Sequence, residues 1–186
     1  MQLKMWRPGD MPVPEYPLYE GFTIRTMREG EEADWAYCCL GEFGVDTPTA
    51  DQFTKRYKDF PIDHVFFACK GDKPVGTASA RVAEENQPFL HYIAVNPEYR
   101  GFKLAKPLVE RVLRCHIDEG RDGCFLTTDD ERIPAVKSYL TLGYCPVLWS
   151  DDARGRWEKA LAAVGIERVA AYMPDLTRVE DIVASK

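Results

Sequence analysis

The chain has 186 residues, a formal net charge of −6, 45% hydrophobic and 29% charged residues, which suits one folded domain with a single core. The acidic balance argues against broad binding to nucleic acid or to an anionic membrane, because both need a basic face. The sequence shows no apolar run long enough for a membrane span and no apolar signal-peptide core, so we expect a cytoplasmic protein.

Cysteine and histidine positions predict no metal site. The chain has six cysteines and three histidines, but it lacks a Cys-x-x-Cys pair. His64, His91 and His116 do not cluster with the cysteines along the sequence. Most cysteines lie in apolar runs, so we expect small, reduced core residues without a disulfide framework.

In chain order, the first half predicts an arm followed by a sheet built from hairpins. Residues 1–20 contain four prolines and little periodicity, which indicates an extended arm lying on the domain. The patterns that follow predict strands at 22–27, 64–70, 75–83 and 89–95, helices at 31–40 and 50–60, and turns at 71–74 and 84–88.

The second half alternates helices and strands. The expected elements are a helix over 104–119, a strand over 124–128, a helix capped by Asp129 or Asp130, a strand over 144–149 and a helix over 153–164. Residues 165–186 form a tail with room for a short helix. We therefore expect one α/β domain over 21–164 with a mixed sheet.

Residues 93–105 are the most informative segment. A strand ends at Val95, Asn96-Pro97 breaks it, a basic turn containing Gly101 follows, and a helix begins near Lys103 or Leu104. Such a strand–turn–helix presents several free backbone N–H groups together with the positive end of a helix dipole. The segment therefore predicts a site for a phosphate or pyrophosphate.

Two motifs together resemble the GCN5-related N-acetyltransferase (GNAT) superfamily over roughly residues 21–149. The first is Val95-x-Pro97-x-x-Arg100-Gly101-x-x-Leu104-Ala105, and the second is Ala135-x-x-x-Tyr139-x-x-x-Gly143-Tyr144. The resemblance implies an acyl-CoA N-acyltransferase fold, with a central, mostly antiparallel sheet and helices on both faces. It implies acetyl-CoA as cosubstrate and no metal.

The same resemblance assigns the cofactor-binding residues. It implies that the backbone of Ile93 and Val95 binds the pantetheine arm. The residues expected to cradle the pyrophosphate are Arg100, Gly101, Phe102, Lys103, Leu104 and Ala105. Lys103 stands where the family usually has a glycine, so it either meets a phosphate with its ammonium or crowds the site; N–H donation survives if its φ stays negative. Arg132 replaces an asparagine that often contacts the cofactor, and we do not transfer that role.

Tyr139 and His91 are the candidate catalytic residues. Tyr139 matches the family's usual acid, which protonates the CoA sulfur, whereas its spacing alone fits a core tyrosine. His91 is the candidate base, because strand alternation places it on one face with Ile93 and Val95, with Tyr92 pointing away. A histidine hydrogen-bonded within the sheet fits equally well. Glu84 and Glu85 could reach the acceptor, although a solvated turn explains them better.

The sequence thus supports an enzyme that transfers acetyl from acetyl-CoA to a primary amine of a small molecule or peptide by direct attack. The alternative is a non-catalytic acyl-CoA-binding or sensor module on the same fold. Aromatic residues in the first two helices and their connection, where the family shapes its acceptor site, suit a cationic or hydrophobic amine but also a core: Trp35, Tyr37, Phe43 and Phe53. The resemblance also makes a homodimer an expectation, since family members often dimerise.

Overall fold

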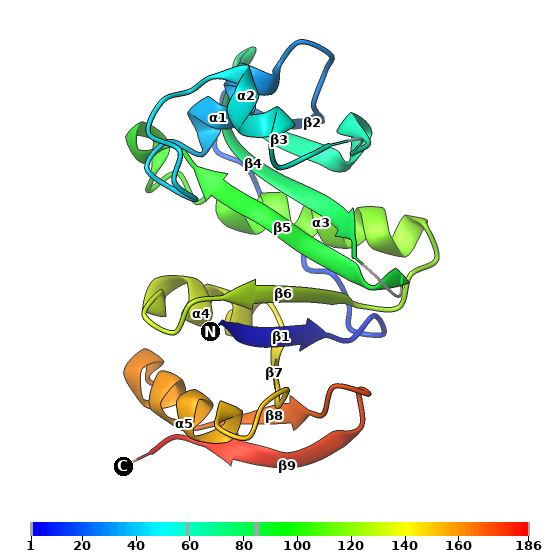
Figure 1. Ribbon diagram of the computed structural model, residues 1–186, viewed down its shortest axis with the longest axis vertical. Coiled ribbons are helices and arrows are strands. Elements are labelled where there is room, and N and C mark those ends of the chain that lie inside the picture. The colour runs from blue at the N-terminus through cyan, green and yellow to red at the C-terminus, as the bar shows by residue number, and fades with distance from the viewer. Residues whose placement is uncertain (1, 59, 84–85, 186) are drawn as a thin grey trace. The chain divides into compact units, whose positions relative to one another are not determined.

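The computed structural model describes residues 2–58, 60–83 and 86–185 (Figure 1). The chain divides into two compact units, the first formed by Met1–Pro12 with Asp122–Lys186 and the second by Val13–Arg121. Glu84 and Glu85 of the predicted acidic turn lie outside the described residues. Within the described part of the chain, no helix combines the length and apolar character that crossing a membrane requires.

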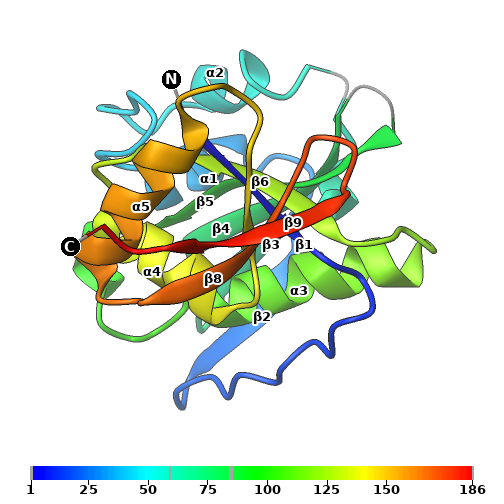
Figure 2. The same ribbon diagram turned by 90° about the horizontal axis from the view of Figure 1, so that it is seen from below.

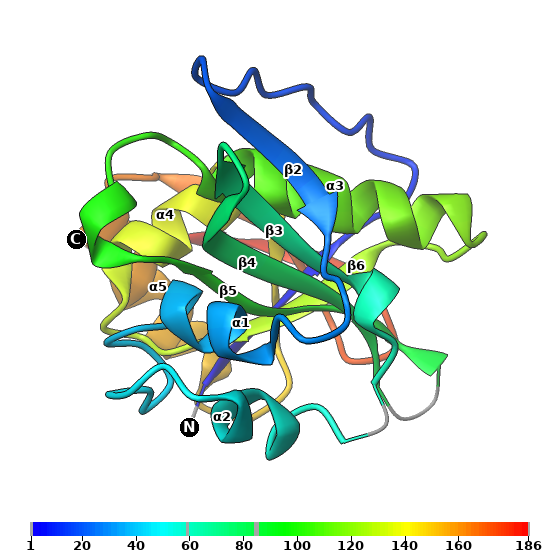
Figure 3. The same cartoon turned by 90° about the horizontal axis from the view of Figure 1, so that it is seen from above.

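The second unit is an antiparallel sheet with helices on both faces. Its elements are β2 (Phe22–Thr26), α1 (Glu32–Cys38), α2 (Ala50–Thr54), η1 (Ile62–His64), β3 (Val65–Lys70), β4 (Lys73–Val82), β5 (Pro88–Val95), η3 (Pro97–Tyr99) and α3 (Ala105–Asp118). The strands follow the order β2-β3-β4-β5. Figure 3 shows α1 and α2 on one face of this sheet and α3 on the other. The predicted order of elements is confirmed.

Helix α3 forms as its spacing predicts. Leu104, Leu108 and Val112 recur at helical spacing and are 2%, 0% and 0% exposed, so this stripe packs against the sheet. Pro107 lies in the first turn, where its missing N–H costs no intrahelical hydrogen bond. The helix thus begins close to the predicted residue, immediately after the basic turn.

Strand β5 carries a β-bulge that sequence alternation alone does not show. The register pairs Val95 with Gly76, Ala94 with Thr77 and His91 with Ser79. Tyr92 and Ile93 therefore lie opposite the single residue Ala78 of β4. Tyr92 has a φ of 44°, a left-handed conformation that is rare for an aromatic residue. Bulges of this kind kink a strand and redirect its side chains, often beside active sites.

Because of the bulge, His91 lies on the opposite face of β5 from Val95. His91 is paired with Ser79 and Val95 with Gly76, and these partners are three residues apart, so they lie on opposite faces of β4. The prediction that His91 shares a face with Ile93 and Val95 is therefore wrong. Tyr92, predicted to point away, packs beside His91 with ring centroids 3.9 Å apart.

The first unit is also built from strands and helices. Its elements are β1 (Leu3–Arg7), β6 (Cys124–Thr128), α4 (Ile133–Thr141), β7 (Cys145–Val147), α5 (Ala153–Val164), β8 (Arg168–Tyr172) and β9 (Arg178–Val183). The strand order is β6-β1-β7-β8-β9, antiparallel except between β7 and β8. Helix α5 packs against β9 (Figure 2).

Three predictions fail in this unit. The expected arm contains β1, an inner strand between β6 and β7 whose Leu3 and Met5 are buried. The short helix suggested for 165–186 is replaced by the β8–β9 hairpin. Neither expected aspartate caps α4: Arg132 occupies the N-cap, and Asp130 pairs instead with Arg156 of α5.

Candidate functional site

Asn96 anchors the end of β5 in the second unit. It is 1% exposed, and its side-chain Nδ2 donates to the carbonyl of Tyr37 at 2.8 Å. Its Oδ1 accepts the N–H of Glu98 at 3.0 Å, which caps η3. The predicted Asn-Pro break is thus confirmed, and the asparagine also ties the strand end to α1.

The turn that follows exposes its backbone to an incoming anion. The side chains of 100–103 are exposed, Leu104 is the buried N-cap residue of α3, and Gly101 has a φ of 91°. Among the described residues, the backbone N–H groups of 101–106 have no protein hydrogen-bond acceptor. Unsatisfied N–H groups at the start of a fourteen-residue helix, α3, are suited to bind a phosphate.

Lys103 departs from the sequence expectation. Its φ is 55°, so the negative φ on which its compatibility with the site depended is not adopted. A left-handed conformation costs a residue with a Cβ atom roughly 1–2 kcal/mol. The structure therefore accommodates a lysine in the backbone conformation that glycine adopts without strain, with its side chain in solvent.

Two side chains of the turn, Arg100 and Phe102, contact residues outside it. The guanidinium of Arg100 lies 3.0 Å from a carboxylate oxygen of Glu42 and remains 57% exposed. The ring of Phe102 packs against Phe22, with centroids 5.0 Å apart. The turn is thus attached to β2 through an aromatic contact, while its two cationic side chains face solvent.

His91 is a neutral imidazole in an apolar setting. Burial, together with the nearby Arg81 cation, lowers its pKa from 6.5 to about 4. Its buried Nδ1 has no hydrogen-bond partner among the described residues. Nδ1 is therefore not satisfied by the described residues of the sheet, and the role of His91 as the base stays a prediction.

The rings beside His91 form an aromatic cluster, defined here as Trp35, Phe43, Phe53, Tyr57, Phe60 and Tyr92. Trp35 makes edge contacts with Phe53, Tyr57 and Tyr92 at centroid distances of 5.6, 5.4 and 5.6 Å. Trp35 and Phe53 are core residues at 0% and 5% exposure, which confirms the packing interpretation for these two.

Tyr37 and Phe43, the other two predicted acceptor aromatics, are half-buried. Tyr37 belongs to a surface network rather than to the aromatic cluster. Its hydroxyl donates to Glu98 at 3.0 Å and accepts from Lys73 at 2.8 Å. Phe43 lies at the edge of the cluster, with its ring centroid 4.9 Å from that of Tyr92.

Tyr139 lies on α4 of the first unit and is half-buried. Its ring centroid is 6.0 Å from that of the buried Tyr144, which follows the same helix. Partial exposure is compatible with a hydroxyl that meets a ligand. Its assignment as the acid stays a prediction.

The comparisons with known proteins agree with this architecture. The family model described as "Acetyltransferase (GNAT) family" matches residues 27–144, which is more than half of the chain. A GCN5-related N-acetyltransferase from Sphaerobacter thermophilus shares the fold with a TM-score of 0.63 at 21% identity, over 78% of this chain and 48% of that one. The fold is that of the GNAT acyltransferases. This chain belongs to the Acetyltransferase (GNAT) family.

Curated relatives carry acetyltransferase names. A mycothiol acetyltransferase of Streptomyces bingchenggensis is 28% identical over 152 residues, covering 77% of this chain and 49% of the relative. An N-acetyltransferase 8B of Rattus norvegicus is 34% identical over 105 residues, covering 54% and 47% respectively. The chain thus spans about half the length of the curated relatives it matches.

Proposed function

We propose that this chain transfers an acetyl group from acetyl-CoA to a primary amine of a small molecule or peptide by direct attack. The observation that carries the proposal is the turn at 100–105, where exposed backbone N–H groups at the start of α3 lie beside two solvent-facing cations, Arg100 and Lys103. This donor set fits a pyrophosphate. The backbone of Ile93 and Val95, beside the bulge, would hold the pantetheine arm.

Acetyl-CoA supplies the acetyl group as a reactive thioester. The acceptor nitrogen must be unprotonated to form its bond to the thioester carbonyl carbon, and the C–S bond then breaks. We assign His91 the acceptance of a hydrogen bond or proton from the attacking amine, directly or through water. We assign Tyr139 the delivery of a proton to the departing CoA sulfur.

The aromatic cluster supports an acceptor that is apolar or cationic around its amine. Phe43 and Tyr92 are half-buried and pack against each other at the edge of this cluster, and the ring of Tyr92 also contacts that of His91. Ring faces attract ammonium groups, and ring edges pack against hydrocarbon. A polyanionic acceptor would gain neither of these two interactions.

Direct assay tests the proposal against its alternative, an acyl-CoA-binding or sensor module. We expect binding of acetyl-CoA by calorimetry and release of CoA thiol over a panel of primary amines, with the acetylated amine identified by mass spectrometry. Micromolar binding without turnover across small, aromatic and peptide amines would favour the sensor. Absence of binding would reject both functions.

Lys103 offers a matched pair of substitutions. Lys103→Gly should raise the free energy of unfolding by about 1 kcal/mol, because glycine adopts a positive φ without strain. Lys103→Ala keeps the strain and should leave stability near that of the wild type. If the ammonium meets a phosphate, both variants should bind CoA about fivefold more weakly. Tighter CoA binding by Lys103→Gly alone would mean instead that the side chain crowds the phosphate. Urea unfolding and calorimetry measure the two effects.

The depressed pKa of His91 makes a pH prediction. Because the imidazole stays neutral above about pH 4, the ratio of wild-type to His91→Ala kcat/KM should be constant between pH 6 and 9. The unfolded chain binds a proton near pH 6.5, so stability should also fall as the pH drops from 6.5 toward 4. His91→Ala should lose part of this acid dependence. A wild-type pH profile of kcat/KM that changes near neutral pH, with the change absent in His91→Ala, would contradict the assignment of His91 as a neutral acceptor.

A further inference from the structure

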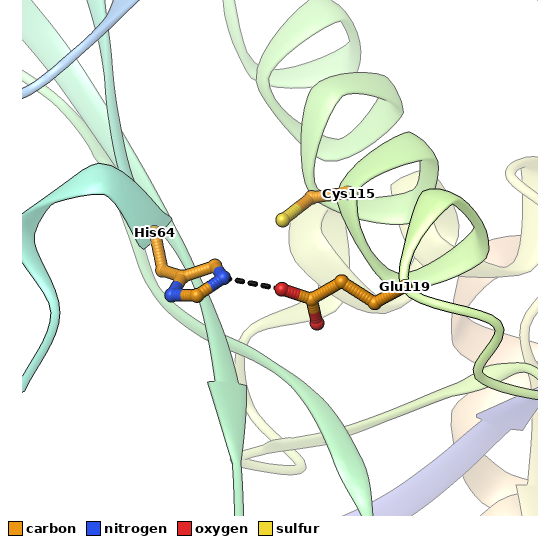
Figure 4. Close-up of side chains that lie close together, drawn as sticks. All are labelled: His64, Cys115 and Glu119. Carbon is orange, nitrogen blue, oxygen red and sulfur yellow. Dashed lines mark hydrogen bonds and ion pairs between the residues drawn. The ribbon is translucent and has the colours of Figure 1, made fainter.

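Three chemically distinct side chains converge in the second unit, outside the residues used above. His64 of η1 meets Cys115 of α3 and Glu119, the C-cap residue of that helix (Figure 4). The ligand atoms of all three lie within 4.8 Å of one another. The spacing of histidines and cysteines along the sequence does not indicate this convergence.

Local structure explains the convergence. Cys115 and Glu119 are four residues apart, so they lie on the same face of α3 one turn from each other. His64 immediately precedes β3, and its Nε2 is 2.5 Å from Oε1 of Glu119. Its Nδ1 lies 3.5 Å from a carboxylate oxygen of Asp63. A carboxylate that accepts a hydrogen bond from Nδ1 directs Nε2 toward a metal. Asp63 lies beside Nδ1 at an ion-pair distance, so a small side-chain rotation would bring it into that position.

We propose that His64, Cys115 and Glu119 bind one Zn²⁺ ion through Nε2, Sγ and a carboxylate oxygen, with water as the fourth ligand. Nitrogen, sulfur and oxygen donors together suit this borderline-soft ion better than Mg²⁺ or Ca²⁺. Tetrahedral Zn²⁺ separates its ligand atoms by roughly 3.3–3.8 Å. In the zinc-bound state Nε2 of His64 and Oε1 of Glu119 would therefore lie slightly farther apart, and Sγ of Cys115 would lie closer to both. Rotations of the three side chains would make these shifts.

The surrounding charges and exposure permit an ion to enter. The side chains of His64 and Glu119 are 26% and 31% exposed, so the cluster is reachable from solvent. Asp63 and Asp118 add negative charge near the sulfur, and Arg111 adds positive charge. Arg121 is also basic, and its Nε lies 2.9 Å from the second carboxylate oxygen of Glu119. That ion pair leaves Oε1 as the oxygen that faces His64.

This site is separate from the phosphate turn. Cys115 lies ten residues beyond Ala105, the first residue of α3, which is about 15 Å along the helix. A bound ion would cross-link the start of β3 to the end of α3. Its role would therefore be to stabilise the second unit rather than to take part in acetyl transfer.

Cobalt substitution tests the proposal on the full chain. After chelator treatment, Co²⁺ should produce a thiolate-to-metal charge-transfer band and the intense visible bands of a four-coordinate ion, both displaced by Zn²⁺. Zn²⁺ should raise the Tm of the wild type, whereas Mg²⁺ should not. Cys115→Ser should abolish the charge-transfer band, and His64→Gln and Glu119→Gln should each weaken Zn²⁺ binding at least roughly tenfold.

Cys145→Ser is the matched control, because Cys145 is also half-buried but belongs to the other unit. It should keep the cobalt spectrum and the Zn²⁺-dependent rise in Tm. Glu119→Gln changes a partly exposed side chain to one of the same shape, so the variant should stay folded. Its weaker Zn²⁺ binding then reports the lost carboxylate rather than unfolding. A wild-type chain without the charge-transfer band, or a band that survives in Cys115→Ser, would overturn the proposal.

Discussion

Replacing Gly123 by alanine is expected to lower the free energy of unfolding by about 2–5 kcal/mol, a large share of the stability of a typical domain. Gly123 has a φ of 83°, and a Cβ atom there would lie 1.9 Å from Cη2 of Trp6 and 2.5 Å from the backbone oxygen of Arg7. Backbone strain contributes roughly 1–2 kcal/mol and the steric overlap roughly 1–3 kcal/mol.

The neighbours of Gly123 have little freedom to move. Gly123 immediately precedes β6, where Cys124 and Phe125 pair with Arg7 and Trp6 of β1. The indole of Trp6 is 5% exposed and packs on Phe125 with ring centroids 4.6 Å apart. Relieving the overlap therefore means separating β1 from β6, which disrupts the sheet of the first unit.

Gly165→Ala provides the control within the same unit. Gly165 ends α5 with a φ of 73°, but none of the described atoms lies within 4 Å of the position of its Cβ. The free energy of unfolding of this variant should fall by only about 1 kcal/mol, the cost of placing alanine at a positive φ. Urea unfolding followed by tryptophan fluorescence compares the two variants. Equal losses would show that steric overlap at Gly123 contributes nothing.

The strand–turn–helix of 93–105 could be predicted because its signals are local. Asn96-Pro97 ends a strand, Gly101 allows a left-handed turn, and Pro107 marks the first turn of a helix, each within a few residues. Strand β1 could not be predicted in this way. Its partners β6 and β7 lie more than a hundred residues away, and a five-residue strand shows too little alternation to be distinguished from an arm.

The site was predictable only in part, for a related reason. A β-bulge depends on pairing with β4, so no pattern within β5 reveals that Tyr92 is left-handed or that His91 leaves the face of Val95. The approach of His64 to Cys115 likewise joins residues about fifty positions apart, which no local pattern reveals. The domain boundaries, the cytoplasmic location and the homodimer stay predictions, as do the roles of the individual site residues.

Tyr139→Phe is expected to lower kcat for acetyl transfer by about 10²- to 10³-fold while leaving the KM for acetyl-CoA within about twofold, because only the transition state gains from proton delivery to the sulfur. The ring is retained, so the free energy of unfolding should change by less than about 1 kcal/mol. Steady-state kinetics and urea unfolding separate loss of chemistry from loss of structure.

Tyr144→Phe is the matched control for this experiment. Tyr144 is buried just after α4, and its ring lies 6.0 Å from that of Tyr139, so both variants remove a phenolic oxygen from the same neighbourhood. Only Tyr139→Phe should lower kcat, whereas Tyr144→Phe should keep the wild-type kcat. Full activity in Tyr139→Phe would return this residue to the packing role that helical spacing alone predicts, and another group would have to protonate the CoA sulfur.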